Sequence, residues 1–164
     1  MRVLAFDQAS RTSGYSVFED GKLITYGKFT YEDDDFGERL VHIRNKVISL
    51  IETHNPDKIA FEDIQLQNNV VNNVDTFKKL AEVFGIIYEL VTERKIPHDI
   101  VLASSWKSSL GIRGRDRAEQ KKNAQLWVST NYNVSPTQDE CDAICIGVYA
   151  SKKIITTQSF DWSE

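Results

Sequence analysis

Residues 1–10 read MRVLAFDQAS, an apolar run that ends abruptly in the carboxylate of Asp7. Residues 3–6 are all apolar, without the alternation typical of a strand that has one face in water. They therefore predict a strand that is covered on both faces of a sheet. Open α/β sheets place their sites at the carboxyl ends of strands, so Asp7 would lie where such a site forms. Taken alone, Asp7 is better interpreted as a solvated aspartate in a turn.

Two further stretches carry acids that could meet Asp7. IAFED brings Glu62 to the end of a second apolar strand, and DECDA places Asp139 and Asp142 three residues apart on one helix face. The alternatives are an ion pair for Glu62, and helix-start acids facing the helix dipole for the two aspartates. Asp142 directly precedes apolar residues, where a carboxylate without a partner would be costly.

A cluster of these four carboxylates would suit divalent metal. The side chains would repel one another, and their pKa values would rise unless cations lay among them. Mg²⁺ prefers oxygen ligands and keeps several waters, so a few carboxylates and substrate phosphate oxygens suffice to bind it. Two such ions about 4 Å apart are the usual means of cutting a phosphodiester.

The 164 residues have the composition of an ordinary globular protein, with 41% hydrophobic and 27% charged residues. One domain is expected over 1–164, with 157–164 as a loosely held tail. No segment approaches the roughly 20 apolar residues of a membrane span, and no leader with a cleavage site is seen, so neither a membrane location nor export is expected. Cys141 and Cys145 are expected to be small core residues of a cytoplasmic protein, without a disulfide between them.

The order of the predicted elements indicates the fold class. Asp20-Gly21 is a strong hairpin signal, so the first three strands predict a meander. The following elements are a helix over 36–54, a strand over 58–63, a helix over 74–94, a strand over 98–103, a short helix capped by Ser104 or Ser105, a helix capped by Asp116 that runs to Tyr132, and a helix over 138–154. This order is that of an α/β protein with the ribonuclease H-like fold, a mixed five-stranded sheet flanked by helices.

The charges are unevenly placed although the net charge is only −4. The segment 107–122 contains six basic residues against two acids, whereas 31–38 contains five acids. The six basic residues, predicted to contact the phosphates of a polyanion, are Lys107, Arg113, Arg115, Arg117, Lys121 and Lys122. Positive charge gathered on one face can bind a polyanion even in an acidic protein, with an affinity that falls steeply with salt. A solvated helix face is the alternative.

Five segments resemble, in order and spacing, those of RuvC-type Holliday junction resolvases: FDQASRTSGYS, IAFEDIQ, SSWK, AEQKKNAQ and DECDAICIGVYA. The resemblance spans nearly the whole chain. It implies an endodeoxyribonuclease of DNA recombination and repair that cleaves Holliday junctions and other branched DNA, three-way structures included. The residues that it implies as metal ligands are Asp7, Glu62, Asp139 and Asp142. Two Mg²⁺ ions would be bound per site, with Mn²⁺ as a substitute.

The resemblance also implies that Lys121 is catalytic and that Lys107 contacts the scissile region. It implies a homodimer, because a four-way junction has approximate two-fold symmetry and must be nicked on two strands. The predicted helix over 74–94 has apolar residues to spare for that interface.

This chain departs from the family pattern at two places. Gln8-Ala9 replaces the usual Pro-Gly, and Gln65 lies near the position where bacterial members carry an aromatic residue. The cleavage sequence, the preference for four-way over three-way junctions and any motor partner therefore stay open. Asp63 and Glu140, next to predicted ligands, are candidate substitutes for them. The Asn-rich stretch after Glu62 is either a disordered connection or a polar loop that enters the junction.

Two other classes of function remain. Actin-like and sugar-kinase domains share the fold, but they need a second copy of it for their nucleotide cleft, for which 164 residues leave no room. The alternative within the superfamily is a non-catalytic binder of branched DNA or an RNA-processing nuclease.

Overall fold

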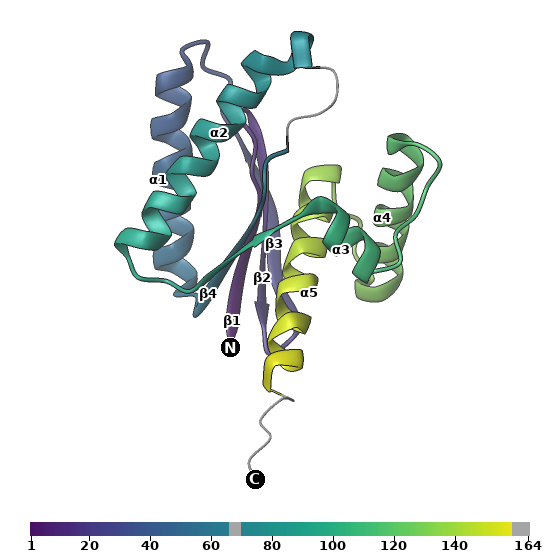
Figure 1. The fold of residues 1–164 in the computed structure, drawn as a ribbon. Coiled ribbons are helices and arrows are strands. Elements are labelled where there is room, and N and C mark those ends of the chain that lie inside the picture. The colour runs from purple at the N-terminus through teal and green to yellow at the C-terminus, as the bar shows by residue number, and fades with distance from the viewer. Residues whose placement is uncertain (66–69, 159–164) are drawn as a thin grey trace.

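The computed structural model describes residues 1–65 and 70–158, with side chains described for 1–65 and 74–152. The Asn-rich stretch at 66–69 and the end of the tail at 159–164 lie outside the described residues. The elements are β1 (Arg2–Asp7), β2 (Thr12–Glu19), β3 (Lys22–Thr30), α1 (Phe36–His54), β4 (Lys58–Glu62), α2 (Val70–Glu93), β5 (His98–Val101), α3 (Ala103–Ser109), α4 (Arg117–Tyr132) and α5 (Gln138–Gln158), as Figure 1 shows.

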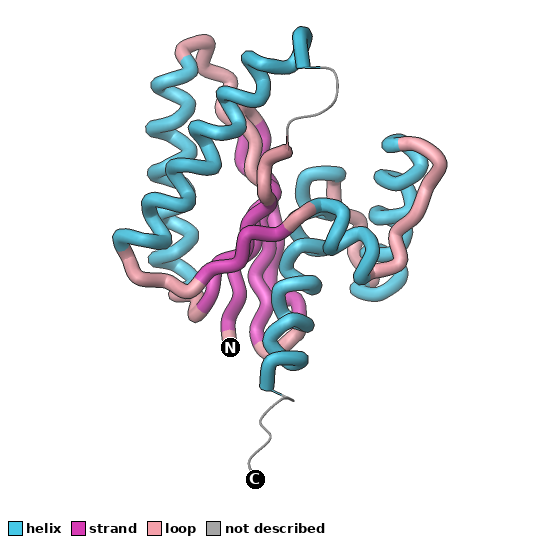
Figure 2. Tube along the Cα trace, viewed as in Figure 1, coloured by secondary structure: helices cyan, strands magenta, loops and turns pink. Residues whose placement is uncertain are grey.

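The strands form one five-stranded sheet in the order β3-β2-β1-β4-β5 (Figure 2). The first three strands are antiparallel neighbours, whereas β4 and β5 run parallel to β1. Asp20 and Gly21 have φ angles of 50° and 77°, which a tight two-residue hairpin requires. The mixed sheet and the meander predicted from the sequence are therefore both confirmed.

Helices cover both faces of the sheet, which explains the unbroken apolar run in β1. In Figure 1, α1 and α2 lie on one face and α5 on the other, with α3 and α4 beside α5. Leu4 and Phe6 pack into the core under α1 and α2, while Val3 and Ala5 pack into the core under α5. Successive strand residues point to opposite faces, so a strand covered on both sides needs apolar residues at every position.

The start of α5 lies unusually close to the sheet. A Cβ atom on Gly14 would lie 2.0 Å from the backbone oxygen of Asp139, so only glycine permits this approach. The Ser16 hydroxyl donates a buried hydrogen bond to the backbone oxygen of Ala143, at 2.7 Å. Because Gly14 is the register partner of Asp7, this packing places the first turn of α5 beside the carboxyl end of β1.

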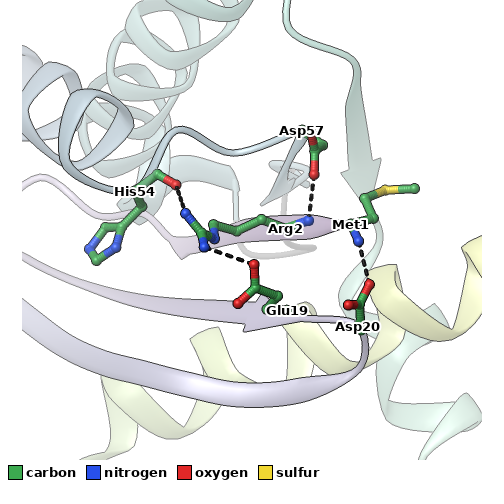
Figure 3. Close-up of polar contacts among 6 residues, drawn as sticks. All are labelled: Met1, Arg2, Glu19, Asp20, His54 and Asp57. Atoms are coloured by element: carbon green, nitrogen blue, oxygen red, sulfur yellow. Dashed lines mark hydrogen bonds and ion pairs between the residues drawn. The ribbon is translucent and has the colours of Figure 1, made fainter.

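Polar contacts hold the opposite end of β1 (Figure 3). The Arg2 backbone N–H donates to Asp57 at 2.7 Å, and its guanidinium donates to the His54 backbone oxygen and to Glu19. The amino-terminal ammonium pairs with Asp20 in the hairpin. These contacts tie the amino end of β1 to β2 and to the connection between α1 and β4, leaving the carboxyl end to form the site.

Several predicted boundaries were wrong. α2 begins at Val70 instead of Val74, because 70–73 contain neither proline nor glycine and continue the helix. β5 ends at Val101 instead of 103, because α3 already begins at Ala103. Leu102 is the N-cap of α3, and its backbone oxygen accepts from the N–H groups of Ser105 and Trp106, so neither predicted serine caps the helix.

The predicted end of the last helix was also wrong. α5 continues to Gln158 instead of ending at Ile154, since no helix breaker intervenes, and so it includes the first two residues of the expected tail. Cys141 and Cys145 are free and buried in α5, as predicted. No helix within 1–65 or 70–158 is long and apolar enough to cross a bilayer.

Candidate functional site

A cavity of about 280 Å³ lies at the carboxyl edge of the sheet and contains all four predicted acids in its lining. Asp7 comes from the end of β1 and Glu62 from the end of β4, which pairs with β1 in parallel. Asp139 and Asp142 come from the start of α5, which the close packing at Gly14 brings to this edge. The fold thus gathers acids from three distant segments around one space.

Burial and mutual repulsion act together on these acids. Burial raises the pKa of Asp7 well above its usual range, and the charges of Asp142, Glu62 and Asp139 raise it further, against the opposing effect of Lys121. Burial, followed by the charge of Glu62, raises the pKa of Asp142 from 3.8 to about 6. Because the metal-free site disfavours the ionised form of these carboxylates, a cation bound among them would stabilise that form.

Several neighbouring groups stabilise the ionised form of Glu62. Burial raises its pKa, but a hydrogen bond from the Trp106 indole and the positive charges of Lys107 and Arg117 oppose that rise. The indole Nε1 donates to Glu62 Oε2 at 2.9 Å. The partner of Glu62 is therefore a neutral donor and not the ion pair that was the alternative.

The donor set fits a hard divalent cation. Within the described part of the chain, no three His, Cys, Asp or Glu side chains form a group that could hold a metal by themselves. Mg²⁺ does not need such a cage, because it commonly takes one or two carboxylates together with waters and substrate phosphate oxygens. Four carboxylates around a space of this size therefore suit Mg²⁺ or Mn²⁺.

Three of the six predicted basic residues line the same cavity: Lys107, Arg117 and Lys121. The Lys107 ammonium lies 5.3 Å from the centre of the Trp106 ring and 3.4 Å from Gln120 Oε1. The other three, Arg113, Arg115 and Lys122, are exposed and outside the cavity lining. Arg115 is 93% exposed and pairs with Glu119 at 3.2 Å. The basic segment thus divides into a cavity group and an outer group.

The two neighbouring acids are used in local structure. Asp63 Oδ1 accepts from the backbone N–H of Ile64 at 2.9 Å. Glu140 Oε2 accepts from the backbone N–H of Thr137 at 2.7 Å, as in one half of a capping box, and from its hydroxyl. Neither Asp63 nor Glu140 lines the cavity. Asp139 does lie in the first turn of α5, so the helix-dipole interpretation also describes it.

Sequence reasoning missed several polar neighbours of the acids. Gln138 Nε2 donates to Asp142 Oδ1 at 2.8 Å, and Gln8 bonds the backbone of Glu62. In the sequence, Trp106 stands out only as part of SSWK. Its hydrogen bond to Glu62 joins residues that are 44 apart in sequence. For Gln8, the signal in the sequence was its position directly after the predicted ligand Asp7. No local pattern could have predicted the Trp106 contact.

A ribonuclease H-like sheet with carboxylates gathered beside lysines at the ends of its central strands defines a nuclease of that fold class. The comparisons narrow this class. The family model described as crossover junction endodeoxyribonuclease RuvC matches residues 3–149. The chain therefore belongs to the RuvC family of metal-dependent crossover junction endodeoxyribonucleases. This membership sets aside the actin-like and sugar-kinase alternative.

Relatives support the family over almost the full length. RuvC of Geotalea uraniireducens is 28% identical over 162 residues, covering 95% of this chain and 92% of the relative. RuvC of Halorhodospira halophila is 26% identical over 148 residues, covering 87% and 85%.

Solved structures support the fold. The T. thermophilus RuvC in complex with a Holliday junction substrate superposes with a TM-score of 0.76 at 18% identity, covering 96% of this chain and 97% of the other. The Fowlpox virus resolvase in complex with Holliday junction DNA has a TM-score of 0.64 at 12% identity, covering 94% and 99%. The predicted ribonuclease H-like fold is therefore confirmed.

Proposed function

We propose that this protein is a Mg²⁺-dependent, structure-selective endonuclease that cleaves Holliday junctions and other branched DNA by two-metal hydrolysis. The observation that carries the proposal is the cavity in which four acids from three segments face three basic side chains. Membership in the RuvC family supports it. Two structural neighbours are described as complexes with Holliday junction DNA, which supports the substrate class.

The metal ligands in this proposal are Asp7, Glu62, Asp139 and Asp142. Their crowding in a partly buried space favours a bound dication, because ionising all of them without one is costly. These four carboxylates would hold two Mg²⁺ ions, which would supply activation of a water for attack on phosphorus and stabilisation of the departing oxygen. Mn²⁺, which takes the same ligand types, is expected to substitute.

The cavity lysines serve the phosphate. Lys121 lines the cavity, and its positive charge lowers the pKa of both Asp7 and Asp142, so it is a candidate to stabilise negative charge that develops during cleavage. The positive charges of Lys107 in α3 and Arg117 in α4 oppose the rise in the pKa of Glu62, and the Lys107 ammonium lies above the Trp106 ring. We assign Lys121 to stabilisation of the developing charge and Lys107 and Arg117 to holding the scissile phosphate.

The outer basic residues bind the DNA backbone at a distance from the cut. Arg113, Arg115 and Lys122 are exposed around the start of α4, where they can contact phosphates without reading bases. Such contacts supply affinity through release of counterions and weaken as salt rises.

A homodimer would present two such sites to the two strands of a junction. Among the described side chains of α2, Val74 and Tyr88 are apolar and exposed, and they are candidates for that interface. Size-exclusion chromatography with light scattering would show twice the chain mass if the proposal is right. The proposed substrate and the two free cysteines agree with the predicted cytoplasmic location.

The decisive test is cleavage of a substrate panel in Mg²⁺: a four-way junction, a three-way branch, a linear duplex and a structured RNA. We expect the branched DNAs to be cut, leaving 5′ phosphate and 3′ hydroxyl ends, with EDTA abolishing the reaction. Asp7→Asn should bind the junction but fail to cut it. The matched control is Asp63→Asn. It removes the charge of an acid beside Glu62 but keeps the side-chain oxygen that accepts from the backbone N–H of Ile64.

Each alternative predicts a different outcome of this panel. Junction binding without cleavage by the wild type would indicate a non-catalytic binder. Preferential cleavage of RNA would indicate an RNA-processing nuclease. Cleavage at the normal rate by Asp7→Asn would show that the site is assigned wrongly.

A further inference from the structure

On the side of β1, the end of β4 is held by a contact that the strand ladder does not supply, whereas on the other side the ladder still pairs Glu62 with Val101 of β5. β1 and β4 pair from Val3↔Lys58 to Phe6↔Phe61, and the register stops one step before Asp7 and Glu62. At that step the side-chain amide of Gln8 takes over. Gln8 Nε2 donates to the backbone oxygen of Glu62, and Gln8 Oε1 accepts from the backbone N–H of Glu62 at 3.2 Å.

These two bonds form a complete amide pair in a buried place. Gln8 is only 8% exposed, so its amide has little water with which to exchange these bonds. A side chain without an amide could not make this pair. Gln8 thus provides a defined contact between the residue after Asp7 and the backbone of Glu62.

A second contact acts on the carboxylate itself. The Trp106 indole donates from Nε1 to Glu62 Oε2, and the ring is 1% exposed, locked in the core beside α5. A donor on a buried ring has one available position, so it fixes where the accepting oxygen lies. The Lys107 ammonium lies 5.3 Å from the centre of the same ring. One rigid side chain therefore contacts both Glu62 and Lys107 of the cavity.

We infer that Gln8 and Trp106 are positioning residues that hold Glu62, backbone and carboxylate, in its metal-binding place before metal arrives. This inference rests on the proposed metal-dependent function. Neither residue needs to touch the metal or the DNA for this role. Partners that orient metal ligands commonly change metal affinity by about 10-fold to 100-fold when they are removed.

The test uses two variants of the full chain and one matched control. Trp106→Phe removes the N–H donor and keeps a ring, and Gln8→Met keeps the side-chain length and removes both bonds. Trp127→Phe is the control, because this indole packs against Tyr132 in α4, outside the cavity. Thermal melts establish that each variant is folded at the temperature of the measurements.

The first readout is calorimetric binding of Mn²⁺ alone, without DNA. We expect Trp106→Phe and Gln8→Met to bind Mn²⁺ about 10-fold more weakly than the wild type, and Trp127→Phe to bind it like the wild type. The second readout is junction cleavage against Mg²⁺ concentration. Both variants should need about 10-fold more Mg²⁺ for half-maximal rate and recover most of the wild-type rate at saturation. A merely structural defect would lower the saturated rate instead.

The outcomes separate the two proposals. Wild-type Mn²⁺ affinity in both variants overturns the positioning role while leaving the proposed nuclease intact. A wild type that binds Mn²⁺ but cuts no substrate overturns the nuclease proposal, and the affinities of the variants still decide the positioning role. If Trp106→Phe fails to fold, Trp106 is required for the fold and a purely positioning role for it is refuted, while Gln8→Met still decides the role of Gln8.

Discussion

Replacing Asp142 with asparagine is expected to make the metal-free protein more stable while destroying its activity. The carboxylate lies at the start of α5, and burial and the charge of Glu62 raise its pKa from 3.8 to about 6. Asparagine carries no charge and keeps the oxygen that accepts from Gln138 at 2.8 Å. The substitution therefore removes the repulsion and leaves the local hydrogen bond in place.

The magnitude follows from the two pKa values. A group with a pKa of 3.8 when unfolded and about 6 when folded opposes folding at neutral pH by up to about 3 kcal/mol. Water screens part of the repulsion because the side chain is not fully buried, so we expect a gain of about 1 to 3 kcal/mol. For a domain of this size each kcal/mol raises Tm by about 2 to 4 °C.

The pH dependence provides an independent check on the sign of the stability change caused by Asp142→Asn. Because the pKa of Asp142 is raised in the folded state, its proton stabilises the fold below pH 3.8, and this stability is lost as pH rises through about 6. The advantage of Asp142→Asn over the wild type should therefore be largest at neutral pH and shrink steadily on acidification below pH 6.

The assay is denaturant unfolding in EDTA at several pH values between 4 and 7.5, followed by the same titrations in Mg²⁺. Mg²⁺ should stabilise the wild type by RT ln(1 + [Mg²⁺]/Kd), about 2.7 kcal/mol at 100 times Kd, and stabilise the variant less. Glu140→Gln is the control, since this acid caps Thr137 outside the cavity. A less stable Asp142→Asn at neutral pH, or a difference that does not depend on pH, would refute the reasoning.

Three further substitutions test other parts of the site. Gly14→Ala should cost several kcal/mol of unfolding free energy, measured by urea titration, because its Cβ would lie 2.0 Å from the Asp139 backbone oxygen; wild-type stability would contradict this packing. Lys121→Met should lower single-turnover cleavage about 10²-fold to 10³-fold with little loss of junction affinity, and an unchanged rate would remove it from the chemistry. Arg113→Gln should weaken junction binding and reduce the slope of log affinity against log salt by about 1, and an unchanged slope would place Arg113 off the DNA.

The sequence was most informative where its signals are local or periodic. The apolar run before Asp7, the Asp20-Gly21 hairpin and the cap at Asp116 each depend on neighbouring residues, and the structure has all of them. Helix boundaries without a nearby proline or glycine could not be predicted. This explains why α2 was predicted to begin at Val74, whereas it begins at Val70.

The meeting of Asp7 and Glu62 was predictable because parallel neighbouring strands end at the same sheet edge. That Asp139 and Asp142 join them was expected, but the packing that brings α5 there was not. It depends on Gly14, a glycine of β2 that leaves room for the backbone of Asp139, 125 positions away. The Trp106 contact with Glu62 was equally hidden. The basic segment was predicted as one surface, whereas the turn of the chain into α4 places only half of the six side chains in the cavity.

The most direct measurement is anomalous X-ray diffraction from crystals of the wild-type protein soaked in Mn²⁺. We expect anomalous peaks in the cavity, within coordination distance of Asp7, Glu62, Asp139 and Asp142, and loss of a peak in Asp7→Asn. Mn²⁺ bound only elsewhere, with those four carboxylates free of metal at saturating concentration, would contradict a nuclease that works through metal held at this edge of the sheet.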